Sequence, residues 1–232
     1  MQKKLKETVC CANLELQKQN LVICSWGNVS GIDRSTGIIA IKPSGVSYDE
    51  LTPGKMVLVD LQGNVIKGSL RPSSDTLTHL ELYRNFAEVG GICHTHSTYA
   101  TIWAQACKSI PPLGTTGADY FYGEVPTTRT LTNEEINSNY ELNTGKVIVE
   151  TFSKIKADPI QMPAVLAACH GPFTWGEDCH KAVENAVVLE NIAKLAFGTV
   201  MLNPDIKNVS DTILNKHFLR KHGANAYYGQ KF

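Results

Sequence analysis

Residues 90–97 of the chain, GGICHTHS, combine a chain break, a short strand-like run and two histidines. Gly90-Gly91 separates this run from the preceding segment, and residues 92–95 have the character of a short strand. Alternate side chains of a strand point to the same face, so the imidazoles of His94 and His96 can converge on one point. The spacing therefore predicts a pair of metal ligands. On spacing alone, a purely structural role for both histidines is equally consistent with the pattern.

A third histidine, His170, follows another short apolar run and precedes Gly171-Pro172. Three neutral imidazoles with one carboxylate or water suit tetrahedral Zn²⁺. We expect Asp75 to supply the carboxylate, because it falls in the first turn of a predicted helix, where the chain can face a pocket. Cys93 and Cys169 each precede a candidate ligand, and strand alternation predicts that both thiols point into apolar packing.

The last two candidate ligands also have structural alternatives. Taken alone, His170 is more often a polar residue at the end of a strand. Asp75 fits as a carboxylate that the dipole of a helix N-terminus stabilises. The residues by themselves therefore leave a zinc site and a structural role at about even odds.

Outward from this stretch, hydrophobic periodicity predicts alternating helices and strands. Helices are expected at about 5–16, 73–86, 98–107, 180–197 and 209–221, with Ser73 or Ser74 as a cap and Gly223 as the last terminator. Ser47 and Glu50 have capping-box spacing for one further short helix. Strands are expected at 38–41, 56–61, 65–66, 92–95, 147–150 and 165–169. This order, with its hairpins, predicts an α/β fold in which helices enclose a central mixed or antiparallel sheet.

Length and charge limit the class of protein. A chain of 232 residues suits a single domain over residues 1–232. Lys plus Arg total 22, as do Asp plus Glu, so no net field favours nucleic acid or anionic membrane. The N-terminus lacks an apolar signal core, and the apolar runs are shorter than the ~20 residues of a membrane span. Seven scattered cysteines without a CxxC pair are typical of free thiols in the cytoplasm.

Three segments in the first 75 residues combine Gly, Ser or Asn, and two of them add a cation. They are WGNVS at 26–30, IKPSG at 41–45 and RPSSD at 71–75. Backbone N–H groups in such loops and at helix N-termini bind anions, and the hydroxyls and Lys42 add donors and charge. None is a Walker or dinucleotide-binding motif, and each alone fits an ordinary turn. Together they favour a phosphate site.

Eight long stretches carry a family resemblance that runs from Leu14 to Gln230. They are LVICSWGNVSGIDR, IKPSGV, RPSSDT-x-TH, GGICHTHS-x-YATIWAQA, GTTGADYFYGEVP, ELNTGKVIVETF, HGPFTWG and KH-x-LRKHGANAYYGQ. In this order they resemble the L-ribulose-5-phosphate 4-epimerases of the class II aldolase/adducin superfamily. The resemblance implies a three-layer sandwich with a central, mostly antiparallel sheet and helices on both faces. It also implies a homotetramer with active sites between neighbouring subunits.

The resemblance also implies roles for individual residues. The implied Zn²⁺ ligands are Asp75, His94, His96 and His170. The implied phosphate-binding residues are Asn28, Lys42, Ser44, Gly45, Ser73 and Ser74. The implied acid/base pair comes from the adjacent subunit and is Asp119 and Tyr228, with Thr115 and His217 lining the pocket.

The activity that the resemblance implies interconverts two phosphorylated ketopentoses, L-ribulose 5-phosphate and D-xylulose 5-phosphate. C4 of the substrate is not adjacent to the carbonyl, so its proton is not acidic. Retro-aldol cleavage of C3–C4, rotation of the aldehyde and re-addition can invert C4 instead, with Zn²⁺ as Lewis acid. The absence of a GxGxxG motif agrees with a reaction that needs no nicotinamide.

One position departs from the resemblance, and three other functions compete with it. The family usually has a histidine where this chain has Gly117. A class II sugar-phosphate aldolase shares the metal site, although the related aldolases use a glutamate near the position of Asp75. A non-catalytic scaffold of the adducin-head type is disfavoured by the intact ligand set. A metal-dependent hydrolase rests on the three histidines alone.

Overall fold

A seven-stranded antiparallel sheet forms the centre of the molecule in the computed structural model, which describes residues 2–229. The strands are β1 (Asn28–Asp33), β2 (Ile38–Ile41), β3 (Val57–Val59), β4 (Val65–Lys67), β5 (Gly91–His94), β6 (Ala164–Ala167) and β7 (Gly171–Gly176). Their order across the sheet is β4-β3-β2-β1-β5-β7-β6, and every neighbouring pair is antiparallel. The strand that carries His94 therefore lies in the middle of the sheet.

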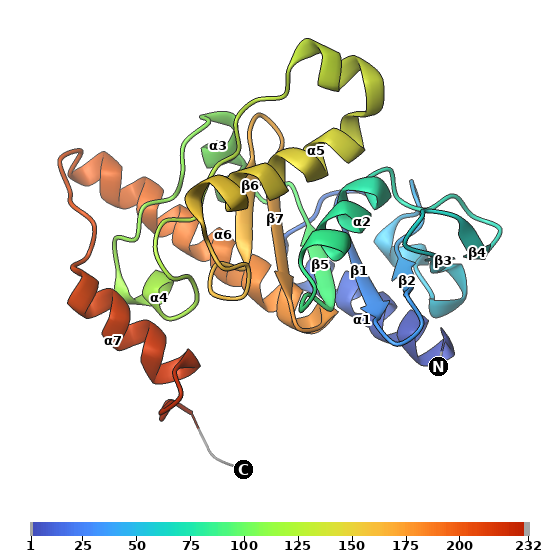
Figure 1. The fold of residues 1–232 in the computed structure, drawn as a ribbon, viewed down its shortest axis with the longest axis horizontal. Coiled ribbons are helices and arrows are strands. Elements are labelled where there is room, and N and C mark those ends of the chain that lie inside the picture. Colours follow the sequence, from blue (N-terminus) through green and yellow to red (C-terminus); the bar gives the residue numbers. More distant parts are fainter. Residues whose placement is uncertain (1, 230–232) are drawn as a thin grey trace.

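Helices cover both faces of this sheet (Figure 1). They are α1 (Gln2–Lys18), α2 (Thr76–Asn85), α3 (Thr98–Gln105), α4 (Thr115–Ala118), α5 (Asn133–Ile155), α6 (Cys179–Leu202) and α7 (Asp211–His222). Short 3-10 turns occupy Tyr48–Glu50 and Pro53–Lys55. The predicted three-layer α/β fold is confirmed.

Strand alternation sorts the apolar side chains into two cores. On one face, α1 and the first half of α6 pack on Val29, Ala40 and Cys93. On the other face, α2 and α5 enclose a larger core that includes Ile92 and Phe173. Within β5 the neighbours Ile92 and Cys93 therefore belong to opposite cores, as the predicted alternation requires.

The strand predicted at 147–150 is wrong, because these residues lie inside α5. A run of β-branched residues is too short to decide between strand and helix when it is fully buried. Thr144, Ile148 and Phe152 are buried at intervals of four, which is one face of a helix. The start of α5 is fixed by a capping box in which Thr132 and Glu135 bond each other's backbone N–H groups.

Four smaller expectations about local structure are also wrong. The strand predicted at 165–169 ends at Ala167, so Cys169 lies exposed in a turn instead of packing in a core. No capping box joins Ser47 to Glu50, and Asp75, not Ser73 or Ser74, occupies the N-cap position of α2. The end of the predicted similarity, Gln230, lies outside the described residues.

Helix α6 is long and apolar enough to cross a membrane by length and composition alone. This is weak evidence, since helices in the core of globular proteins meet the same criteria. Here α6 packs on β5 and β7 and contributes to both cores.

At Gly91, the sheet packs closely against the start of α6. A methyl group on Gly91 would lie 2.2 Å from the backbone nitrogen of Cys179, so Gly91→Ala forces the first turn of α6 away from β5. We expect a loss of about 2–4 kcal/mol in the free energy of unfolding, measured by urea denaturation. The control is Gly198→Ala in α6, whose methyl group meets no atom within 4 Å. It should be neutral or stabilise by up to about 1 kcal/mol. Equal effects of the two substitutions would contradict the close packing.

Candidate metal centre

Three histidines from two adjacent strand ends converge in the structure. His94 ends β5, His96 follows two residues later, and His170 lies in the turn between β6 and β7. One ring nitrogen from each lies within 4.8 Å of the others. The Nε2 atoms of His94 and His96 are 3.1 Å apart. Two zinc–nitrogen bonds of about 2.0–2.1 Å at a tetrahedral angle place their nitrogens about 3.3 Å apart, so the imidazoles present fit a divalent metal.

Hydrogen bonds to the other ring nitrogens orient two of these imidazoles. Nδ1 of His94 is 2.9 Å from the carbonyl oxygen of Pro172, so Nδ1 donates and leaves the lone pair on Nε2. The ring also stacks on Phe173 with centroids 4.1 Å apart. The hydroxyl of Tyr140 lies 3.4 Å from Nδ1 of His170. Such partners fix ring orientation and tautomer in metal sites.

The local electrostatics keep two of these imidazoles, those of His96 and His170, neutral, which metal binding requires. Burial and, to a smaller extent, the neighbouring His94 lower the pKa of His170 to about 3. Burial, with His94 again contributing, also lowers the pKa of His96. Both rings therefore offer a lone pair at neutral pH.

Asp75 lies in the same cavity, but its carboxylate is outside the group of three converging nitrogens. Its Oδ2 accepts a hydrogen bond of 2.7 Å from Nδ2 of Asn28. Burial alone would raise the pKa of this carboxyl, but the imidazoles of His94, His79 and His170 outweigh burial and lower it. An ionised carboxylate thus borders the three rings, and its role as fourth ligand stays a prediction.

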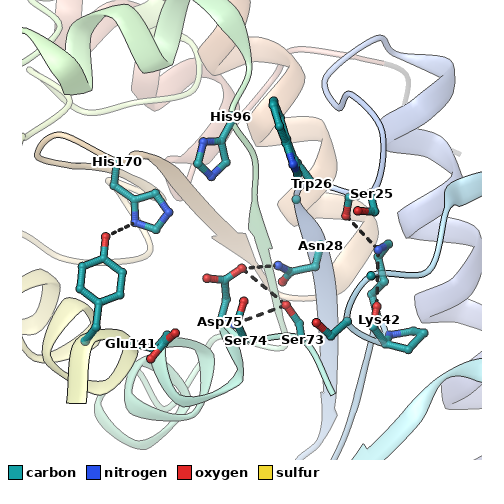
Figure 2. A pocket seen from close by; sticks show the side chains of 15 residues that line it. Ser25, Trp26, Asn28, Lys42, Ser73, Ser74, Asp75, His96, Glu141 and His170 are labelled. Atoms are coloured by element: carbon teal, nitrogen blue, oxygen red, sulfur yellow. Dashed lines mark hydrogen bonds between the residues drawn. The ribbon is translucent and has the colours of Figure 1, made fainter. Parts of the chain in front are cut away.

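A cavity of about 530 Å³ connects this centre with the predicted phosphate residues (Figure 2). Its lining includes all six of them, Asn28, Lys42, Ser44, Gly45, Ser73 and Ser74. In the view of Figure 2, His96 and His170 lie at one end and Lys42 at the other. Segments far apart in the sequence thus form one site.

Backbone hydrogen bonds hold two of these segments together. The amide of Ser44 donates to Arg71, and the amide of Ser73 donates to Lys42, both at 3.0 Å. Gly45 has a φ of +71°, a conformation that glycine adopts without strain. The loops at 41–45 and 71–75 therefore form one wall of the cavity.

Lys42 is the cation of this wall, and its side chain is only 2% exposed. Its Nζ donates to the carbonyl of Ser25 at 3.1 Å and lies 4.9 Å from the ring centre of Tyr48. Burial lowers its pKa to about 8. The amine remains mostly protonated at neutral pH, without a carboxylate partner among the described residues, so it can pair with an anion.

The predicted acid/base residues form a separate cluster on α4 and α7. Asp119 accepts from Nε and Nη2 of Arg220 at 3.0 and 2.7 Å, and Nδ1 of His217 is 3.1 Å away. The ring of Tyr228 lies 4.8 Å from the Arg220 guanidinium carbon. Thr115 is exposed at the first residue of α4. None of these described residues lines the metal cavity.

Sequence reasoning missed several residues that line the cavity. Tyr140 and Glu141 project from α5, and Ser25 comes from the loop before β1. Helix α5 was not predicted, so its residues could not be placed. The sequence LTNEE at 131–135 contains the capping box that marks the start of this helix, and that signal could have found it.

The sequence also matches a described family. Residues 7–197 match the Class II Aldolase and Adducin N-terminal domain. The chain belongs to this family. Among solved structures, an L-fuculose 1-phosphate aldolase is 24% identical, with 92% of this chain and 94% of that chain covered and a TM-score of 0.78.

Two further solved structures share the fold of this class II aldolase family member. YgbL from Escherichia coli, described as an aldolase/epimerase/decarboxylase, is 25% identical, with 93% and 98% of the two chains covered and a TM-score of 0.73. An L-fuculose 1-phosphate aldolase from Glaciozyma antarctica PI12 is 19% identical, with 97% and 84% covered and a TM-score of 0.77. The fold is thus shared over nearly the whole chain.

The buried His79 beside this centre predicts a pH dependence of stability. Burial lowers its pKa from 6.5 to about 3. The unfolded chain therefore takes up the proton first, so stability is complete above pH 6.5 and falls as the pH drops toward 3. We expect up to about 1.4 kcal/mol per pH unit from this group in urea unfolding of metal-free protein. His79→Asn should reduce this slope, and an unchanged slope would contradict the assignment.

Proposed function

We propose that this chain is a cytoplasmic, metal-dependent sugar-phosphate 4-epimerase that interconverts L-ribulose 5-phosphate and D-xylulose 5-phosphate. The observation that supports this most is the single cavity whose lining combines His96 and His170, two of the three converging histidines, with the six anion-binding candidates. A small phosphorylated ketose requires a metal that binds its carbonyl and hydroxyl oxygens and a polar wall that binds its phosphate. The family supports chemistry on a carbon–carbon bond.

The phosphate would bind at the wall formed by residues 41–45 and 71–75. The ammonium of Lys42 and the hydroxyls of Ser44, Ser73 and Ser74 line this wall, and the N-terminus of α2 begins at its edge. Unpaired N–H groups at a helix start favour anions. A phosphate held there would keep the cleaved aldehyde fragment in the site while it rotates.

The metal would be held by His94, His96 and His170, with Asp75 as the fourth ligand, and Zn²⁺ suits this donor set. When bound it would supply Lewis-acid polarisation of the ketose carbonyl. The carboxylate of Asp75 lies beside the imidazoles. To bind the metal through Oδ2, it would give up the hydrogen bond that it accepts from Asn28.

Proton transfer at the C4 hydroxyl would fall to Asp119 and Tyr228. Burial alone would raise the pKa of Asp119, but hydrogen bonds from Arg220 and His217 outweigh it and lower the pKa. Asp119 is therefore ionised at neutral pH, so it has the free lone pairs that a proton acceptor needs, and the Tyr228 hydroxyl would return a proton on the opposite face.

These two residues would come from a neighbouring copy of the chain in a homotetramer. Asp119 directly follows α4, Tyr228 lies beyond the end of α7, both contact Arg220, and neither lines the described cavity. The ends of α6 and α7 expose apolar side chains such as Leu195, Leu202 and Leu219, which self-association would cover.

Incubation of metal-loaded protein with L-ribulose 5-phosphate tests the proposal directly. We expect D-xylulose 5-phosphate, identified by the configuration of C4 in the NMR spectrum, without free aldehyde. Metal-stripped protein is the control and should be inactive. Failure to invert C4 with any divalent metal would overturn the epimerase.

The alternative is a class II aldolase, which the described solved structures favour because two of them are L-fuculose 1-phosphate aldolases. Such an enzyme would release the aldehyde from the same cavity. A coupled assay for free aldehyde separates the two functions. Sustained aldehyde release without C4 inversion would establish the aldolase.

Replacing Lys42 by methionine is expected to weaken substrate binding. Methionine keeps the length of the buried side chain but removes its charge, so KM should rise about 10–100-fold, since a charge-assisted hydrogen bond contributes about 1.5–3 kcal/mol. Inorganic phosphate should inhibit the variant correspondingly less. Lys18→Met, at an exposed position on α1, is the control and should leave KM unchanged. Equal KM values for both variants would remove Lys42 from the phosphate site.

A further inference from the structure

Two exposed thiols lie side by side next to the metal centre. Cys107 follows the C-terminus of α3, and Cys169 immediately precedes the metal-ligand candidate His170. Their Sγ atoms are 3.6 Å apart, although 62 residues separate them in the sequence. Both side chains are exposed, so apolar packing does not account for the pair.

The backbone brings these two residues together. The amides of Cys107 and Cys169 donate to the same acceptor, the carbonyl of Ala104, at 3.1 and 2.9 Å. Their φ angles are 52° and 60°, so both residues adopt the left-handed conformation that non-glycine residues rarely take. The shared acceptor makes the proximity of these two residues a property of the backbone, and the side-chain rotamers set the distance between their sulfurs.

We propose that Cys107 and Cys169 are an oxidisable dithiol whose disulfide links α3 to the turn carrying His170. A hydroperoxide supplies the oxidising equivalents. One thiolate attacks the peroxide, the O–O bond breaks, and a sulfenic acid and hydroxide form. The second thiolate attacks that sulfur, the S–O bond breaks, and the disulfide and a second hydroxide form. In sum, two thiols and one hydrogen peroxide give one disulfide and two waters, and an added dithiol reverses the change.

Formation of this bond is expected to disturb the metal centre. A disulfide requires the sulfurs at about 2.05 Å, so they must approach by about 1.5 Å. Rotation of the exposed side chains supplies part of this movement, and the turn at Cys169 supplies the rest. His170 is the next residue, and metal ligands tolerate displacements of only about 0.2 Å. Oxidation should therefore weaken metal retention.

The first test counts thiols in the metal-free protein after hydrogen peroxide treatment, so it does not depend on the proposed function. The wild type should lose two thiols towards a thiol reagent, fall in intact mass by two hydrogens, and recover both on reduction. Cys107→Ser should instead stop at the sulfenic acid, which a dimedone probe traps. Cys24→Ser is the matched control, because Cys24 is equally exposed and has a φ of 55°. It should behave as the wild type. Persistence of both thiols, or equal disulfide formation in Cys107→Ser, would overturn the site.

The second test measures metal release to a chromogenic chelator from oxidised and reduced protein. This step rests on the metal centre proposed above but needs no substrate, so failure of the epimerase assay would not affect it. Oxidised wild type and Cys24→Ser should release metal several-fold faster than their reduced forms. Cys107→Ser should release metal at the same rate after peroxide treatment as in the reduced form. Equal rates for the two forms of the wild type would overturn the coupling to the metal centre.

Discussion

Replacing His96 by asparagine is expected to leave the protein folded but unable to retain a divalent metal. The substitution removes the nitrogen that lies 3.1 Å from Nε2 of His94 and leaves two of the three converging imidazoles. Loss of partners that merely orient metal ligands already costs about 10–100-fold in affinity, so loss of a ligand should exceed about 100-fold. Metal content after dialysis, with the affinity from calorimetric titration, measures the effect.

A matched control exists in His180, which lies exposed in the first turn of α6. His180→Asn should keep wild-type metal content. The far-ultraviolet circular dichroism of both variants should match that of the wild type, which separates metal loss from unfolding. Full metal occupancy in His96→Asn would exclude this histidine from the ligand set and with it the proposed centre.

The parts of the site that lie on one short stretch of chain were predictable from the sequence. His94 and His96 required only the alternation of one strand, and the segments at 41–45 and 71–75 carry their donors within five residues each. That these segments share one cavity depends on the antiparallel order of β1, β2 and β5, which no local pattern encodes. The family resemblance, not the periodicity, supplied that link.

The sequence did not predict strands β1 and β7 or helix α5, and it misplaced the thiol of Cys169, in each case for a physical reason. The strands β1 and β7 are buried along most or all of their length and contain Ser, Gly and Pro, so neither shows the alternation that marks a half-buried strand. Helix α5 carries a mid-helix break at Asn139, which hides its periodicity. The exposure of Cys169 follows from a turn with a φ of 60°, whereas strand alternation would have buried its thiol.

Replacing Asp119 by asparagine is expected to lower turnover by about 10²–10⁴-fold while metal content stays at the wild-type level. Asparagine keeps the shape of the side chain but cannot accept a proton, and its amide cannot form the paired bonds that Arg220 makes with the carboxylate. Tyr228→Phe should act in the same direction by removing the hydroxyl that returns the proton. Near-normal turnover in both variants would show that proton transfer belongs to other groups, and Glu141 in the cavity wall would be the next carboxylate to test.

Mixing the two inactive variants distinguishes a site shared between chains from a site within one chain. The Asp119→Asn chain keeps an intact metal cavity, and the His96→Asn chain keeps an intact Asp119. If neighbouring copies complete each site, dissociating and reassembling an equimolar mixture creates interfaces where an intact cavity meets an intact carboxylate. Random assembly through a heterologous interface should restore about a quarter of wild-type activity. If each chain instead supplied its own carboxylate, every site would carry one defect and the mixture would stay inactive.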